Sequence, residues 1–178
     1  MQTLYLAGGC FWGVQKYFDQ FRGVKSTEAG YANGPEGTSA PDYEEVCTGV
    51  GFAETVKVVF DPAVLPAKKL LEYFFLAIDP LAVNRQGPDV GVQYRTGIYY
   101  EAQEEESLLP DILSAVAEQE AKLGEKLATE VAPLCNYYPA ETWHQDYLKK
   151  NPYGYCHLPK RAFFVQYAMD KAAEEGVE

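Results

Sequence analysis

The stretch Gly8-Gly9-Cys10-Phe11-Trp12-Gly13 constrains this chain most, because it joins a short apolar run, residues 4–7, to a helical pattern. The run is typical of a strand. After it, apolar residues recur at three- and four-residue steps, as in an amphipathic helix: Phe11, Val14, Phe18 and Phe21. Cys10 is therefore expected at the turn from strand into helix, where free N–H groups lower a thiol's pKa. The two glycines should let the backbone turn sharply and leave the sulfur uncovered.

Two interpretations of Cys10 compete. A cysteine taken at random is most often a small buried side chain among core aromatic residues. Trp12 lies off the apolar stripe, so the helix does not need it for packing. The placement favours Cys10 as a nucleophile with aromatic walls.

Composition bounds the class of protein. With 178 residues, 47% apolar and 23% charged, the chain has the length and composition of one globular domain, residues 1–178. The net charge of −11 argues against nucleic-acid binding, and most of it comes from residues 101–130, which hold nine acids against two lysines.

No leader or membrane-length apolar run is evident, so we expect a cytoplasmic protein with reduced cysteines. The four cysteines form no C-x-x-C pair, which favours redox chemistry over a structural zinc site.

The remaining pattern mixes helices and strands and predicts an α/β fold with helices on a central sheet. Expected strands lie at 24–31, 54–60, 96–100 and, more briefly, within 127–133. Expected helices follow Pro66 up to Asp79, run from 101 to 123 with Pro110 kinking or dividing the helix, and span 141–150. Residues 151–159 read as a flexible loop that carries Cys156, and about 171–178 as an acidic tail.

Glu54 is unusual because strand periodicity places it on the same face as Val56, Val58 and Phe60. An acid there is either a frayed strand end in water or a carboxyl held partly dry with a raised pKa. The loop 84–95 is also notable, because Arg, Asp, Gln and Tyr crowd a surface segment that leads into a strand.

Several motifs together resemble the type A methionine sulfoxide reductases, the peptide-methionine (S)-S-oxide reductases. The matching segments cover nearly the whole chain in order: Gly9-Cys10-Phe11-Trp12-Gly13, Phe21-Arg22-Gly23-Val24, Tyr43-Glu44-Glu45-Val46-Cys47, Ala53-Glu54, Asn84-Arg85-Gln86-Gly87, Gln93-Tyr94-Arg95, Tyr138-Pro139-Ala140-Glu141 and His144-Gln145-Asp146-Tyr147-Leu148. Three positions depart from the family pattern, where Phe52 replaces His, Pro88 replaces Asn and Trp143 replaces Tyr. The resemblance implies a two-layer α/β sandwich with a mixed sheet, a ferredoxin-like core and a long C-terminal loop.

The resemblance also implies roles for individual residues. Cys10 would be the nucleophile, Phe11 and Trp12 the pocket for the substrate's S-methyl group, and Glu54 the acid that protonates the sulfoxide oxygen. The polar side of the site would be completed by Tyr43, Asp89 and Tyr94. Cys156 would resolve the Cys10 sulfenic acid as a disulfide.

The same resemblance implies methionine (S)-sulfoxide, free or in proteins, as substrate and thioredoxin as the external reductant. It implies no bound cofactor or metal, no nucleic-acid or membrane partner, and a monomer. The chemistry fits independently, since sulfoxide reduction needs a soft nucleophile and a proton for the departing oxygen.

Three alternatives remain open. A thiol peroxidase also uses a sulfenic acid, but it needs neither the aromatic pocket nor the separate acid Glu54. A Cys–His hydrolase would pair Cys10 with His144, for which a surface position on a polar helix is the simpler expectation. A non-enzymatic module that binds methionine or aromatic side chains would consume no thiol reductant.

Overall fold

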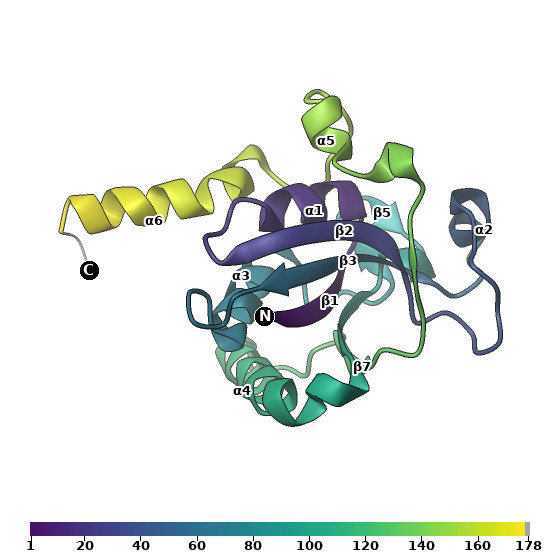
Figure 1. Cartoon of the computed structure of the whole chain (residues 1–178), viewed down its shortest axis with the longest axis horizontal. Coiled ribbons are helices and arrows are strands. Elements are labelled where there is room, and N and C mark those ends of the chain that lie inside the picture. Colours follow the sequence, from purple (N-terminus) through teal and green to yellow (C-terminus); the bar gives the residue numbers. More distant parts are fainter. Residues whose placement is uncertain (177–178) are drawn as a thin grey trace.

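The computed structural model describes residues 1–176 and centres on a six-stranded sheet (Figure 1). Its strands, in chain order, are β1 (Gln2–Gly8), β2 (Val24–Ala32), β3 (Ala53–Phe60), β6 (Thr96–Tyr100), β7 (Glu130–Pro133) and β8 (Tyr137–Pro139). Their spatial order is β7-β6-β1-β3-β2-β8. Only β6 and β7 pair in parallel, and the other neighbours are antiparallel, so the sheet is mixed as predicted.

Helices and short turns connect the strands. The α-helices are α1 (Phe11–Phe18), α2 (Tyr43–Cys47), α3 (Ala67–Ala77), α4 (Glu105–Leu123), α5 (Tyr147–Lys150) and α6 (Val165–Glu174). Short 3-10 turns are η1 (Val92–Tyr94), η2 (Ala102–Glu104), η3 (Thr142–His144) and η4 (Lys160–Phe164), and β4 (Arg85–Gln86) pairs with β5 (Asp89–Val90) in a small hairpin. No helix within residues 1–176 is long and apolar enough to cross a membrane.

The main core lies between α1, α3 and α4 and one face of the sheet. Alternate strand residues such as Leu4 and Leu6 on β1, and Val56 and Val58 on β3, point into it and are fully buried. This is the period of two that a strand with one apolar face requires. The opposite face carries a smaller cluster around Tyr5 and Tyr99 that the segment 132–137 covers.

The predicted elements around the Cys10 stretch are confirmed. The expected strands correspond to β1, β2, β3, β6 and β7, and the expected helix after Pro66 is α3. The apolar stripe Phe11, Val14, Phe18 and Phe21 is buried in the main core, although α1 itself ends at Phe18. Helix α4 runs through Pro110, which therefore does not divide it, and Gly124 ends it in the left-handed conformation.

The expected helix over 141–150 is wrong. The segment forms η3 and α5, and Asp146 between them has a φ of 52°. The Gln145 side chain explains the break, because it accepts a hydrogen bond from Ala29 N at 2.8 Å and donates one to Ala29 O at 2.8 Å. This side chain pairs with β2 as a neighbouring strand's backbone would, and a continuous helix would withdraw it.

The expected acidic tail over about 171–178 begins inside a helix that the sequence analysis does not predict. Helix α6 extends through Glu174 and projects from the body of the protein (Figure 1), while 177–178 lie outside the described residues. Its partly buried side contacts the main core, where Tyr73 Oη donates to Met169 Sδ at 3.1 Å. On its polar side, Arg22 pairs with Asp170 at 3.0 Å.

We expect Gly30→Ala to destabilise the fold by about 1–3 kcal/mol, the usual cost of overpacking. Gly30 on β2 lies under the Tyr137 ring, which occupies the space that a Cβ would fill. Urea unfolding of Gly30→Ala in the wild-type and Tyr137→Ala backgrounds measures this cost. The Tyr137→Ala background should relieve most of it, and an equal cost in both backgrounds would contradict this packing.

Candidate active site

Cys10 occupies the position that the sequence predicts, immediately before α1. The backbone reaches it through Gly9, whose φ of 86° lies in the left-handed region. A Cβ at Gly9 would also lie 2.8 Å from Cβ of Gln86. Glycine is therefore required here both for the turn and for the close approach of β4.

The expectation of an uncovered sulfur with a lowered pKa is wrong for Cys10. The side chain is only 7% exposed. The segment 156–158 covers this stretch, since Cβ atoms added at Gly9 and Gly13 would lie 3.1 Å from His157 Nε2 and 2.9 Å from Cys156 Sγ. Burial raises the pKa of the Cys10 thiol well above its usual value and the charge of Glu54 raises it further, whereas the backbone N–H of Trp12 lowers it. Desolvation thus outweighs the helix start.

Glu54 projects from β3 to the beginning of α1. Its Oε2 accepts a hydrogen bond from Phe11 N at 3.0 Å, and its side chain is 1% exposed. Burial raises the pKa of Glu54 to about 8, although the bond from Phe11 lowers it. Of the two interpretations of this acid, the structure supports the dry carboxyl over the frayed strand end.

Two tyrosines lie within electrostatic range of this carboxyl. Tyr43 begins α2 and Tyr94 ends η1, and both are half-buried. Burial raises the pKa of each phenol, and the charge of Glu54 contributes to both shifts. Both phenols therefore keep their protons at neutral pH and can donate hydrogen bonds.

Phe11 and Trp12 belong to an aromatic cluster whose centre is His144. Trp12 Nε1 donates a hydrogen bond to His144 Nδ1 at 2.8 Å, and the indole stacks on Tyr147 at 3.7 Å between ring centroids. Ring centroids of Phe11 and Tyr43 lie 5.0 Å and 4.6 Å from that of His144. Trp12 is only half-buried, so one part of the ring is free to contact a ligand.

His144 is fully buried, so the expected surface position is wrong. Burial lowers the pKa of His144 to about 4, and the imidazole is neutral with Nδ1 as the acceptor for Trp12. Glu141 supports the same cluster, because Oε2 accepts from Tyr31 Oη at 2.8 Å and Oε1 accepts from Tyr43 N at 2.9 Å. The Gln145 side chain pairs with β2 and turns this segment inward, and no pattern in the sequence signals that contact.

Cys156 lies between two polar anchors of its loop. Tyr155 Oη donates to Asp89 Oδ1 at 2.7 Å, and the His157 ring bonds to Gly8 O through Nε2 at 3.2 Å. Asp89, expected on the polar side of the substrate site, thus holds the C-terminal loop over Cys10. Cys156 itself is half-buried beside Gly13 of α1.

The other positions singled out in the sequence lie around this centre. Phe52 is buried against Tyr138, and Trp143 is half-exposed and stacks on His144 at 3.6 Å. Cys47 on α2 and Cys135 are both exposed. Within residues 1–176, no three His, Cys, Asp or Glu side chains gather in a way that could hold a metal ion.

Comparison with known proteins decides the family. The model of peptide methionine sulfoxide reductases matches residues 2–175. The chain belongs to this family. A peptide methionine sulfoxide reductase MsrA of Clostridium perfringens is 51% identical over 159 residues, which are 89% of this chain and 98% of the relative.

Solved structures agree with this assignment. The reduced form of Mxr1 from Saccharomyces cerevisiae has a TM-score of 0.80 and 37% identity, covering 87% of this chain and 88% of Mxr1. A structure of Mxr1 in complex with Trx2 has a TM-score of 0.56 and 24% identity, covering 82% and 84%. The protein is an oxidoreductase that reduces methionine sulfoxide.

We expect the reductase to lose stability as the pH rises from about 4.5 to about 8, and Glu54→Gln to remove part of that loss. The folded chain keeps a proton on Glu54 that the unfolded chain releases above pH 4.5. The native state then binds more protons, so the free energy of unfolding falls with pH. Urea unfolding of both proteins between pH 5 and 9 measures this, and parallel pH dependences would contradict a dry carboxyl.

We expect His144→Phe to raise the KM for methionine sulfoxide about tenfold, because it leaves the Trp12 indole N–H without its acceptor. An unsatisfied donor costs about 1–3 kcal/mol, and 1.4 kcal/mol corresponds to tenfold. His144→Asn is the matched control, since its amide oxygen can take the place of Nδ1. Steady-state kinetics of the two variants decide the matter, and equal KM values would exclude positioning of Trp12 by this bond.

Proposed function

We propose that this reductase converts methionine (S)-sulfoxide to methionine with Cys10 as nucleophile and Glu54 as general acid. The observation that carries the proposal is the meeting of a buried thiol and a buried protonated carboxyl at the beginning of α1. Glu54 Oε2 accepts a hydrogen bond from the backbone N–H of Phe11, the residue that follows Cys10. Sulfoxide reduction needs these two groups together, because sulfur is attacked while its oxygen takes a proton.

The pocket is proposed to fix the substrate by three groups. Phe11 and Trp12 receive the S-methyl group, and Glu54, Tyr43 and Tyr94 hold the oxygen as hydrogen-bond donors. The methyl group, the oxygen and the side of the sulfur that faces Cys10 are then all fixed, so only one epimer reacts. The family resemblance makes it the S epimer. The aromatic cluster around His144 supports this arrangement, since it holds Phe11, Trp12 and Tyr43 against one side chain.

The proposed relay uses Cys156. The sulfoxide oxygen passes to Cys10, which becomes a sulfenic acid while methionine leaves. The Cys156 thiol then attacks that sulfur, and a Cys10–Cys156 disulfide and water form. A protein dithiol, thioredoxin, reduces the disulfide by exchange. Support comes from the position of Cys156 beside α1 and from the yeast relative, which has been solved in complex with Trx2.

The proposal extends to the fold, the oligomeric state, the need for a cofactor and the cellular location of the protein. A ferredoxin-like core is supported by the element sequence β1-α1-β2-β3-α3-β6 and by the antiparallel spatial order β6-β1-β3-β2. We propose a monomer that needs no bound cofactor and works in the cytoplasm. The four free cysteines are consistent with a reducing compartment.

Rapid mixing with methionine sulfoxide, in the absence of reductant, tests the chemistry. We expect wild type to form about one methionine per enzyme and to lose two hydrogens in a mass measurement, mapped to Cys10 and Cys156. Cys156→Ser should still form one methionine and then stall with thioredoxin, whereas Cys10→Ser should form none. One equivalent of methionine from Cys10→Ser, or full thioredoxin-driven turnover of Cys156→Ser, would overturn the assignment.

A further inference from the structure

Arg95 closes the motif Gln93-Tyr94-Arg95 and takes no part in the proposed chemistry. It lies directly between η1, which ends at Tyr94, and β6, so it joins the turn that carries this phenol to the sheet. Only 12% of its side chain is exposed. A guanidinium holds its N–H donors in a rigid planar fork, so an arginine shielded from water can bind several fixed acceptors at once.

We propose that Arg95 is a positioning residue that holds the Tyr94 phenol where it donates to the sulfoxide oxygen. The inference rests on the proposed function, because it assigns what fixes one of the groups that hold this oxygen. Arg95 acts through the backbone of η1 and does not itself contact the substrate.

The first support is that Arg95 bonds to the turn itself. Its Nη1 donates to Val92 O at 3.0 Å, and its backbone N–H donates to the same oxygen at 3.3 Å. Because η1 is only three residues long, few internal hydrogen bonds hold its shape, and bonds of the 3-10 type have poorer geometry than those of an α-helix. The guanidinium therefore fixes the carbonyl on which the turn closes, and with it the backbone that carries Tyr94.

The second support is that the other nitrogens of the fork join η1 to two distant segments. Nη2 donates to Asn33 O at 2.9 Å, and Nε pairs with Glu130 Oε2 at 3.2 Å. Asn33 follows β2 directly, and Glu130 begins β7. Glu130 Oε2 also accepts a hydrogen bond from Tyr99 Oη at 2.6 Å, so the carboxylate is itself held in place. One side chain thus fastens the turn to both segments.

The third support is that Asn33 is a fixed anchor. Its side chain donates from Nδ2 to Pro133 O at 3.1 Å and accepts at Oδ1 from Cys135 N at 2.8 Å. Its backbone N–H donates to Asn136 O at 3.1 Å. The carbonyl that Arg95 uses is therefore held from several sides, and loss of the guanidinium should displace η1 rather than Asn33.

A purely structural role for Arg95 makes a different prediction. It would lower the stability of the protein and leave the chemistry of the folded enzyme unchanged. Positioning requires instead that loss of Arg95 slows the reaction only while Tyr94 has its hydroxyl, because two residues that act through one group are not additive.

A double-mutant cycle separates the two roles. Arg95→Gln is made in the wild-type, Tyr94→Phe and Tyr43→Phe backgrounds. Arg22→Gln is the matched control, since Arg22 is an exposed arginine that pairs with Asp170. Urea unfolding first establishes that each variant is folded under the assay conditions.

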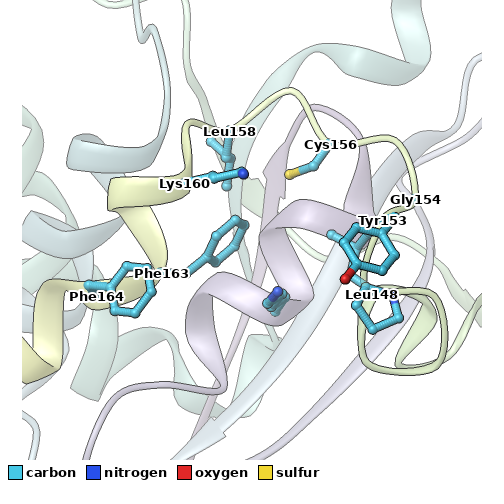
Figure 2. A pocket seen from close by; sticks show the side chains of 10 residues that line it. Leu148, Tyr153, Gly154, Cys156, Leu158, Lys160, Phe163 and Phe164 are labelled. Carbon is cyan, nitrogen blue, oxygen red and sulfur yellow. The ribbon is translucent and has the colours of Figure 1, made fainter.

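The quantity measured is the rate constant for methionine formation in a first turnover, at saturating methionine sulfoxide and without reductant. In the proposed relay, methionine forms before Cys156, which Figure 2 shows in the loop beside α1, attacks the sulfenic acid. This rate constant therefore reports the step in which Tyr94 acts.

We expect Arg95→Gln to lower the rate constant about tenfold, since a misplacement of about 1 Å in an active site can cost about 10²-fold. The same substitution should change it by less than about twofold in Tyr94→Phe and keep its full effect in Tyr43→Phe. Arg22→Gln should match wild type. If Arg95→Gln does not fold, Arg95→Lys, which keeps the charge but loses the fork, provides the same comparison with a smaller loss.

An equal loss in the wild-type and Tyr94→Phe backgrounds, or no loss in wild type, would overturn the positioning of Tyr94 by Arg95 and leave the proposed function intact. If Tyr94→Phe formed methionine as fast as wild type, the role of Tyr94 in the proposed function would fail, and the positioning proposal would fail with it.

Discussion

The hydrogen bond from Phe11 N to Glu54 Oε2 is the contact on which the site depends. It joins β3, in the middle of the sheet, to the first turn of the helix that follows Cys10. The bond uses one of the N–H groups that a helix start leaves free, and it holds a buried carboxyl at the residue that follows the thiol. Because burial raises the pKa values of both groups, both keep their protons in the resting site, and the proposed mechanism draws on the proton of Glu54.

The fold around this contact could be predicted from local patterns. The apolar alternation of Leu4 and Leu6 and the helical stripe after Cys10 identify β1 and α1, and strand periodicity places Glu54 on the buried face. Such patterns report which face of an element is buried, and that suffices for the sheet and for the position of Cys10.

What could not be predicted depends on contacts between residues distant in sequence. His144 is buried because Gln145 pairs with Ala29, 116 residues earlier, and no local periodicity records that bond. The thiol pKa of Cys10 was expected to fall because the helix start is visible in the sequence, whereas the cover supplied by 156–158 is not. Helix α6 was missed because none of its residues is fully buried, which leaves little apolar signal.

Methionine is rare in this chain, which matters for an enzyme whose substrate is oxidised methionine. Only Met1 and Met169 are present, and the Met169 sulfur accepts a hydrogen bond from Tyr73 in the partly buried side of α6. The thioether is the group that oxidants convert into this enzyme's own substrate. A methionine sulfoxide reductase with so few methionines offers almost no oxidised methionine to other copies of itself. The activity of those copies therefore remains for other proteins.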